Sequence, residues 1–259
     1  MPRGDAAATT AGQALWLLTA AVIALEVPYP LVHGHARDVL TIATVVVFAA
    51  AALSHAALAS SVSTAVALLV VFAAGGFAAE VVGVHTGGPF GSYRYTGHLG
   101  ATVAGVPVVI ALAWVMMAWP AACVAARIVT RRAARVAVAT AALATWDVFL
   151  DPQMVDAHHW RWLGESAHLP GIDDVPLTNF AGWFAVSLVL MALLHRSTNG
   201  PHIRDDRPMV TLWMWTWLSS TLANVAFFHR PAVAGWGFVA MGAVGAPLML
   251  SMRASGRAV

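Results

Sequence analysis

The chain has 259 residues, of which 59% are hydrophobic and only 10% are charged, and its mean hydropathy is +0.74. A soluble domain needs more charge on its surface, so this composition excludes an ordinary soluble globular protein. The formal net charge is +2, and no basic tract interleaved with aromatic residues indicates nucleic acid binding. Cys123 is the single cysteine, which excludes an intrachain disulfide framework and a thiolate metal cluster.

Apolar runs of about 20 residues, the length that crosses a bilayer, recur along the whole chain. They predict an all-α, polytopic transmembrane helix bundle with eight spans, or seven on the lower count, forming a single membrane domain over 1–259. We expect the segment 1–12 to be a short tail. The first apolar run is not followed by a convincing small-residue cleavage site, so we expect no removed signal peptide. The predicted spans are 13–32, 38–59, 62–85, 104–126, 134–154, 177–195, 209–228 and 232–252.

Arginine placement predicts the orientation of these spans, because cytoplasmic loops of membrane proteins are enriched in basic residues. With eight spans, both termini lie on one side, and ten of the 14 basic residues fall there. The other four are Arg37, Arg94, Arg161 and Arg230. We therefore expect a multi-pass protein of the cell membrane with both termini in the cytoplasm and the loops 86–103 and 155–176 on the outer side.

The stretch "EVVGVHTGGPFGSYRYTGHLG", Glu80 to Gly100, follows the third apolar run. Its glycines permit tight turns and close backbone approach, and Pro89 fixes one bend. It lacks the GK[ST] ending of a phosphate-binding loop. We expect a compact capping or re-entrant loop over the bundle, rich in glycine and aromatic residues, since irregular backbone at membrane depth must be buried in protein or face a cavity.

Four carboxylates lie near the outer ends of their spans: Glu26, Glu80, Asp147 and Asp151. A charged residue within a span costs about 2.5–3.5 kcal/mol on insertion scales, and such residues usually face the protein interior. Asp147 and Asp151 are four residues apart, so an intact helix places them on one face. Pro152 disfavours the helical conformation of the residue before it, so we expect the helix to end or kink there.

Clustered carboxylates in a low-dielectric environment cannot all stay ionised, so at least one is expected to be a neutral acid that can donate a proton. A divalent cation could neutralise them instead, and each taken singly could be a structural hydrogen-bonding group between helices. Histidine ligation by His85, or by the His158-His159 pair with Asp156, is conceivable. No HExxH or similar spacing exists, however, so we predict no metal site and no cofactor.

Aromatic residues are frequent at span ends, as expected for an interfacial belt. A subset falls near the carboxylates, where aromatic faces can stabilise cations or line an apolar ligand site. The stretch "WMWTW", Trp213 to Trp217, is interpreted as core packing or lipid contact. The candidate substrate-binding residues are His85, Phe90, Tyr93, Tyr95, Trp146, Trp160, Asn179 and Trp183.

Three segments together resemble a known family: the loop over 80–100, "WDVFLDPQMVDAHHWRW" over 146–162, and "VPLTNFAGW" over 175–183. They look like the integral-membrane carotenoid biosynthesis proteins of the CruF type, which comprise carotenoid 1,2-hydratases and bisanhydrobacterioruberin hydratases. The pattern E-x-x-G-x-x-T-G-x-P-F-G-x-Y-x-Y is long, and the D-P and N-F-x-G-W elements follow in the expected order. The resemblance covers 70–250.

The resemblance implies a hydratase that adds water to a terminal isoprenoid double bond of an acyclic or monocyclic carotenoid, without a cofactor. It also makes the lipid bilayer and other carotenoid biosynthesis enzymes the expected partners. On chemical grounds, either Glu80 or Asp147 is expected to be the acid. Asp151 and Glu26 would assist it or position water.

Four other readings stay open from the sequence. Lycopene-cyclase-like chemistry starts with the same protonation and closes a ring instead of capturing water. Prenyl transfer would use the Asp147–Asp151 pair to hold a magnesium diphosphate, although no second aspartate-rich loop is present. A transporter would relay protons through its carboxylates, although no paired repeat is evident. A carotenoid-binding protein would bind pigment without changing it.

Overall fold

The computed structural model describes residues 3–164, 166–198 and 203–256. Within them the chain forms an all-α bundle of eight long helical segments. The first segment is α1 (Arg3–Glu26), and the second is α2 (His35–His55) with a π-helical end (Ala56–Ser60). The third is a continuous rod made of α3 (Val62–Leu68), a π-helical segment (Leu69–Ala74) and α4 (Gly75–Thr86). The other five are α5 (Val109–Ile128), α6 (Arg132–Ala144) together with α7 (Asp147–Asp156), α8 (Leu177–Ser197), α9 (Arg207–Ala226) and α10 (Pro231–Gly256).

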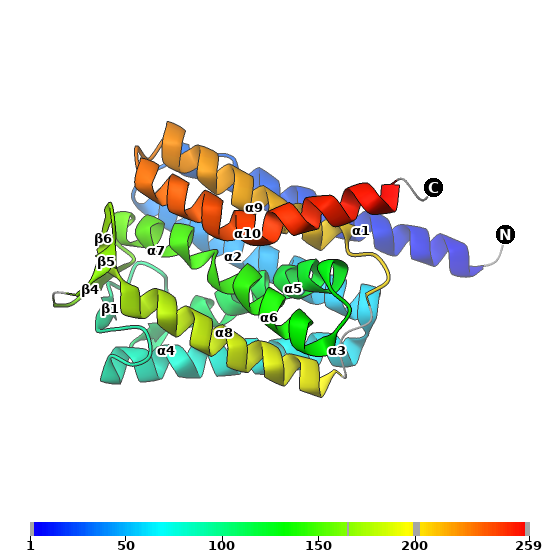
Figure 1. Ribbon diagram of the computed structural model, residues 1–259, viewed down its shortest axis with the longest axis horizontal. Coiled ribbons are helices and arrows are strands. Elements are labelled where there is room, and N and C mark those ends of the chain that lie inside the picture. The colour runs from blue at the N-terminus through cyan, green and yellow to red at the C-terminus, as the bar shows by residue number, and fades with distance from the viewer. Residues whose placement is uncertain (1–2, 165, 199–202, 257–259) are drawn as a thin grey trace.

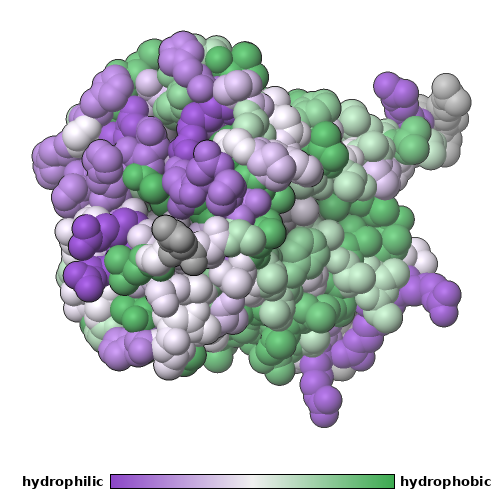
Figure 2. Space-filling model, turned by 60° about the vertical axis from the view of Figure 1, so that its left-hand side comes forward, coloured by the Kyte–Doolittle hydropathy of each residue, from purple (hydrophilic) through white to green (hydrophobic). Residues whose placement is uncertain are grey.

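Seven of these segments are long and apolar enough to cross a membrane, by length and composition, and α9 is the one outside that group. The chain is therefore a multi-pass membrane protein. Figure 1 shows both termini at one end of the bundle and the small strands at the opposite end. Figure 2 shows hydrophilic residues gathered over the strand-bearing end, next to a broad hydrophobic surface along the helices. This division matches a bundle whose flank faces lipid and whose end faces water.

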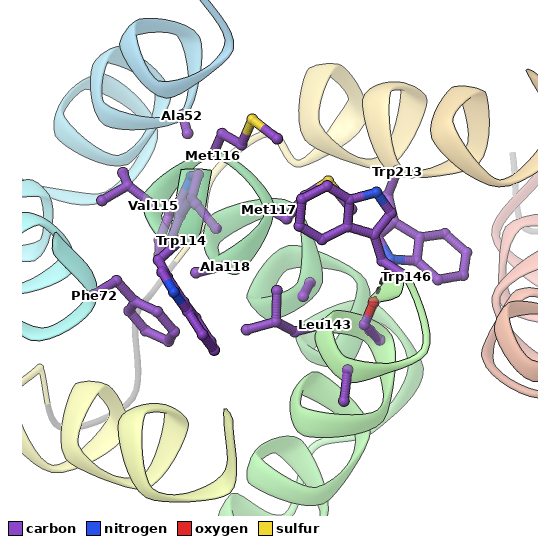
Figure 3. Close-up of a cluster of buried hydrophobic side chains, with 14 of the residues drawn as sticks. Ala52, Phe72, Trp114, Val115, Met116, Met117, Ala118, Leu143, Trp146 and Trp213 are labelled. Atoms are coloured by element: carbon purple, nitrogen blue, oxygen red, sulfur yellow. Dashed lines mark hydrogen bonds between the residues drawn. The ribbon is translucent and has the colours of Figure 1, made fainter. Parts of the chain in front are cut away.

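Helix α5 is the centre of the bundle. Most of its side chains are buried, and it contacts α2, α6 and α9 as well as the π-helical segment of the α3–α4 rod. Figure 3 shows its residues from Trp114 to Ala118 packed among side chains of those neighbours, including Phe72, Leu143 and Trp213. Because α5 is held from several sides, a polar group on a neighbouring helix that faces it is also removed from lipid and water.

Among the described residues, six short strands lie at the end opposite the termini, and they form three two-stranded antiparallel ladders. β1 pairs with β4, so backbone hydrogen bonds join the loop over 86–103, which is rich in glycine and aromatic residues, to the loop that follows α7. β5 and β6 form a hairpin tied to the start of α10, because Asp174 forms an ion pair with Arg230. The strands are β1 (Tyr93–Tyr95), β2 (Thr102–Val103), β3 (Val106–Pro107), β4 (Trp160–Trp162), β5 (His168–Leu169) and β6 (Ile172–Pro176).

The structure differs from the sequence-based expectations in two places. α1 begins at Arg3, so most of the expected tail over 1–12 is helical. Of the two predicted outcomes at Asp151–Pro152, an end or a kink of the helix, the end is wrong. The interruption lies at Thr145 and Trp146, between α6 and α7, and Pro152 is inside α7. The Pro152 carbonyl is bound by the Arg230 guanidinium, which helps to hold α7 beyond the proline.

Candidate active site

A cavity of about 370 Å³ lies inside the bundle. Its lining comes from α1, α2, α4, α5, α7, α8 and α9 together with the β1–β4 ladder, so residues far apart in the sequence meet there. Ten of the predicted site residues line this cavity. They are Glu26, Glu80, Phe90, Tyr93, Tyr95, Trp146, Asp151, Trp160, Asn179 and Trp183.

Glu80 lies on α4, and only 6% of its surface is exposed. Its Oε2 atom accepts hydrogen bonds from the hydroxyls of Tyr93 and Tyr95, the latter at 2.9 Å, and its Oε1 atom accepts one from Trp114 Nε1 at 3.1 Å. Three donors converge on this one carboxylate. These hydrogen bonds favour the ionised form of the Glu80 carboxyl group, whereas its burial favours the neutral form.

The two tyrosines reach Glu80 because they are two residues apart on β1, so both side chains leave the same face of the strand. Across the ladder, Tyr93 opposes Trp162 with ring centroids 5.0 Å apart, and Tyr95 opposes Trp160 at 5.6 Å. Burial, and then the nearby Glu80 charge, raise the pKa of both phenols. They therefore stay protonated and act as donors.

Trp114 is a candidate site residue that the sequence reasoning missed, because it lines the cavity. Besides donating to Glu80, its indole stacks on Trp183 with ring centroids 4.2 Å apart, and Trp146 meets Trp183 edge-on at 6.0 Å. Gly76 makes room for this indole, since a Cβ atom there would lie 2.4 Å from Trp114 Cγ. The glycine one turn before Glu80 was the available signal that a large side chain packs beside that carboxylate.

Replacing Gly76 with alanine is expected to displace Trp114, break its hydrogen bond to Glu80 and lower activity by at least about tenfold, the cost of ~1.4 kcal/mol in the barrier. The matched control is Gly235→Ala on α10, where an added Cβ meets no atom within 4 Å. Product formation and tryptophan fluorescence of both variants check this. Equal activity in the two variants would show that the Trp114 position does not matter.

Asp147 and Asp151 form a pair of carboxyl groups at the start of α7. Both accept hydrogen bonds from the same Asn179 Nδ2 atom, that to Asp147 at 2.6 Å. They are 0% and 3% exposed. Asp151 lines the described cavity and Asp147 does not, and Asp147 Oδ1 has no hydrogen-bond partner among the described residues. Asp151 also has a side-chain hydrogen bond to Trp160. Mutual repulsion in a buried environment disfavours simultaneous ionisation of the two carboxyl groups.

Glu26 lines another part of the same cavity. Its Oε2 atom accepts a hydrogen bond of 2.7 Å from Trp215 Nε1 on α9, and no hydrogen bond joins it to the Glu80 or Asp151 groups within the described chain. Trp215 is the middle tryptophan of "WMWTW" and lines the cavity too. The packing interpretation therefore holds for its neighbour Trp213, which is fully buried, but not for Trp215.

His85 is the predicted residue that the structure does not bring to the site. It is exposed near the end of α4, and its Nδ1 atom is 3.0 Å from the Val81 carbonyl of the preceding turn. It is absent from the described cavity lining. The physical reason is helix geometry: five residues after Glu80 correspond to about 500° of rotation, which turns His85 some 140° away from it.

The family model described as "Carotenoid biosynthesis protein" matches residues 40–251 of this chain. The chain belongs to this family. The match includes Glu80, the Asp147–Asp151 pair and Asn179, so most of the candidate site of this carotenoid biosynthesis protein lies inside the family region, whereas Glu26 lies before it. Comparison with curated proteins and with solved structures finds no match.

Proposed function

We propose that this carotenoid biosynthesis protein is a hydratase that adds water to a terminal isoprenoid double bond. The observation that supports this most is the buried Asp147–Asp151 pair, which presents Asp151 to a cavity walled by stacked tryptophans. A carboxylic acid beside aromatic faces suits the protonation of an alkene, because the faces stabilise the resulting carbocation. Glu80, with its three donors, is the candidate anion in the same cavity.

In the proposed reaction, the alkene π electrons form a new C–H bond with the Asp151 proton at the less substituted carbon. This leaves a tertiary carbocation and an Asp151 carboxylate. A water molecule then forms the C–O bond, and its excess proton passes to Glu80 and finally back to the aspartate pair. The sum is alkene plus water to tertiary alcohol. Asp151 acts as acid and Glu80 as base, while Asp147 and Asn179 position the acid.

The substrate would enter from the bilayer between α1 and α9. There the cavity lining includes apolar residues that are themselves exposed on the flank of the bundle, namely Val27 (55% exposed), Leu222 (62%) and Phe227 (46%). An apolar chain can therefore lie partly in lipid while its end reaches the buried acid. We place this site on the outer side of the cell membrane, with cytoplasmic termini, as the arginine distribution predicts.

Leu222→Trp is expected to narrow this entrance and slow turnover of a long carotenoid by about tenfold, an effect of ~1.4 kcal/mol on the barrier. Leu218→Trp, one turn earlier on the same helix, is the control. Leu218 is also exposed, at 49%, but it does not line the described cavity. Initial rates over a range of substrate concentrations check this. Equal loss in both variants would contradict entry between α1 and α9.

The test of the function is expression in a host that accumulates an acyclic carotenoid, followed by chromatography and mass spectrometry of the pigments. Hydration predicts a more polar product that is heavier by one water for each modified end. An apolar isomer of unchanged mass would indicate cyclisation, and unaltered pigment would indicate binding or transport; either result would overturn the proposal.

A further inference from the structure

A second cluster of polar side chains lies outside the cavity, at the strand-bearing end. Asp38, His98 and His159 each present one potential ligand atom, and these three atoms lie within 4.8 Å of one another. Asp38 comes from the first turn of α2, His98 from the loop after β1, and His159 from the turn between α7 and β4. Three segments that are distant in sequence thus converge on one point.

The environment of the His159 side chain indicates that a ligand binds there. Its side chain is fully buried, yet neither Nδ1 nor Nε2 makes a hydrogen bond within the described chain. Buried imidazoles normally have a partner, because an unsatisfied buried polar group costs about 1–3 kcal/mol. A neutral imidazole keeps a lone pair that can bind a metal ion.

The distance between the His159 and Asp38 side chains suits two ligands of one metal ion better than a direct hydrogen bond. His159 Nδ1 is 3.8 Å from Asp38 Oδ1, which is beyond hydrogen-bonding distance. Two ligands bound tetrahedrally to zinc, with bonds of about 2.0–2.2 Å, lie about 3.4 Å apart. The pair is therefore close to that spacing, and the neighbouring cation Arg37 is engaged elsewhere, by its Nε bond to the Val32 carbonyl and its position over the Tyr29 ring.

The backbone holds two of the ligands in place. Thr96 N donates to the His159 carbonyl at 3.0 Å, which extends the β1–β4 ladder toward His98. We propose that Asp38, His98 and His159 bind a divalent transition metal ion of the zinc type, with a fourth position open to water. Two imidazoles and one carboxylate suit zinc. The ion would fasten α2 to the ladder that carries Tyr93 and Tyr95.

The test uses the full-length protein in detergent, stripped with a chelator and titrated with Zn²⁺ against a chromophoric competitor. We expect one Zn²⁺ per chain, weaker Mn²⁺ binding as the Irving–Williams order requires, and no competition from Mg²⁺, which prefers oxygen ligands. Zn²⁺ should also raise the thermal midpoint, because a ligand that binds the folded state stabilises it.

His98→Gln is expected to weaken Zn²⁺ binding at least about tenfold, the lower end of what loss of even an outer-shell partner costs. His98 is exposed, so this variant should fold. The control His85→Gln changes another exposed histidine and should bind like the wild type. Absence of Zn²⁺ binding by the wild type, or equal affinities in the two variants, would overturn the proposal. Neither readout involves carotenoid turnover, so the proposed function is tested separately.

Discussion

Asp151→Asn is expected to reduce hydration by about 10²–10⁴-fold, the usual contribution of a positioned general acid. An amide cannot supply the proton that starts the reaction, although it nearly matches the carboxyl group in size and can still lie against Asn179. The neighbouring Asp147 does not line the described cavity, so it cannot replace Asp151 as the proton donor. Rates of alcohol formation in membranes with equal amounts of protein check this expectation.

The control for this variant is Asp173→Asn on β6, an exposed carboxylate paired with His168 at 3.0 Å. It should leave the rate unchanged, because it lies outside the cavity lining. If Asp151→Asn turned over at the wild-type rate, Asp151 could not be the acid, and the proton would have to come from another group.

Glu80→Gln is expected to have the second largest effect, a loss of about 10²-fold or more. The amide is uncharged, so it neither stabilises a carbocation nor accepts the proton of the attacking water. It also turns an NH₂ group toward donors that were arranged for a carboxylate, namely Tyr93, Tyr95 and Trp114. The measurement is alcohol formation, together with a thermal melt that reports whether the fold persists.

Incubation of the two variants with substrate in deuterium oxide distinguishes the role of Asp151 as acid from that of Glu80 as base. In Glu80→Gln, protonation by Asp151 followed by return of a proton should exchange substrate hydrogens for deuterium, even though hydration is slow. In Asp151→Asn, both exchange and hydration should be lost, because no cation forms. Exchange in the Asp151 variant but not in the Glu80 variant would reverse the assignment of acid and base.

Much of the fold could be predicted because apolar runs of bilayer length determine where helices lie, and the eight predicted spans correspond to the eight helical segments. The predicted topology also brought Glu80, Asp147 and Asp151 into one region of the bundle, and Glu80 and Asp151 line the same cavity. The interruption at Thr145 and Trp146 was not predicted, because Pro152 is the stronger local signal in the sequence. The cost of a proline inside α7 is offset by tertiary contacts, including the hydrogen bond from Arg230 to the Pro152 carbonyl.

The finer arrangement of the site depends on which face of each helix points inward. Trp114 is one of several large residues in an apolar run, and only its packing against Gly76 and Trp183 places it beside Glu80. The Asp38, His98 and His159 cluster was similarly hidden, because its members are spread over three segments with no local spacing pattern. The β1–β4 ladder, which the sequence did not predict, brings two of them together.

The most direct test of hydration is mass spectrometry of the product formed by the purified protein in oxygen-18-labelled water. The account predicts an alcohol that carries one labelled oxygen at each modified end, in the wild type but not in Asp151→Asn. A product without the label, or one that retains the mass of the substrate, would contradict it.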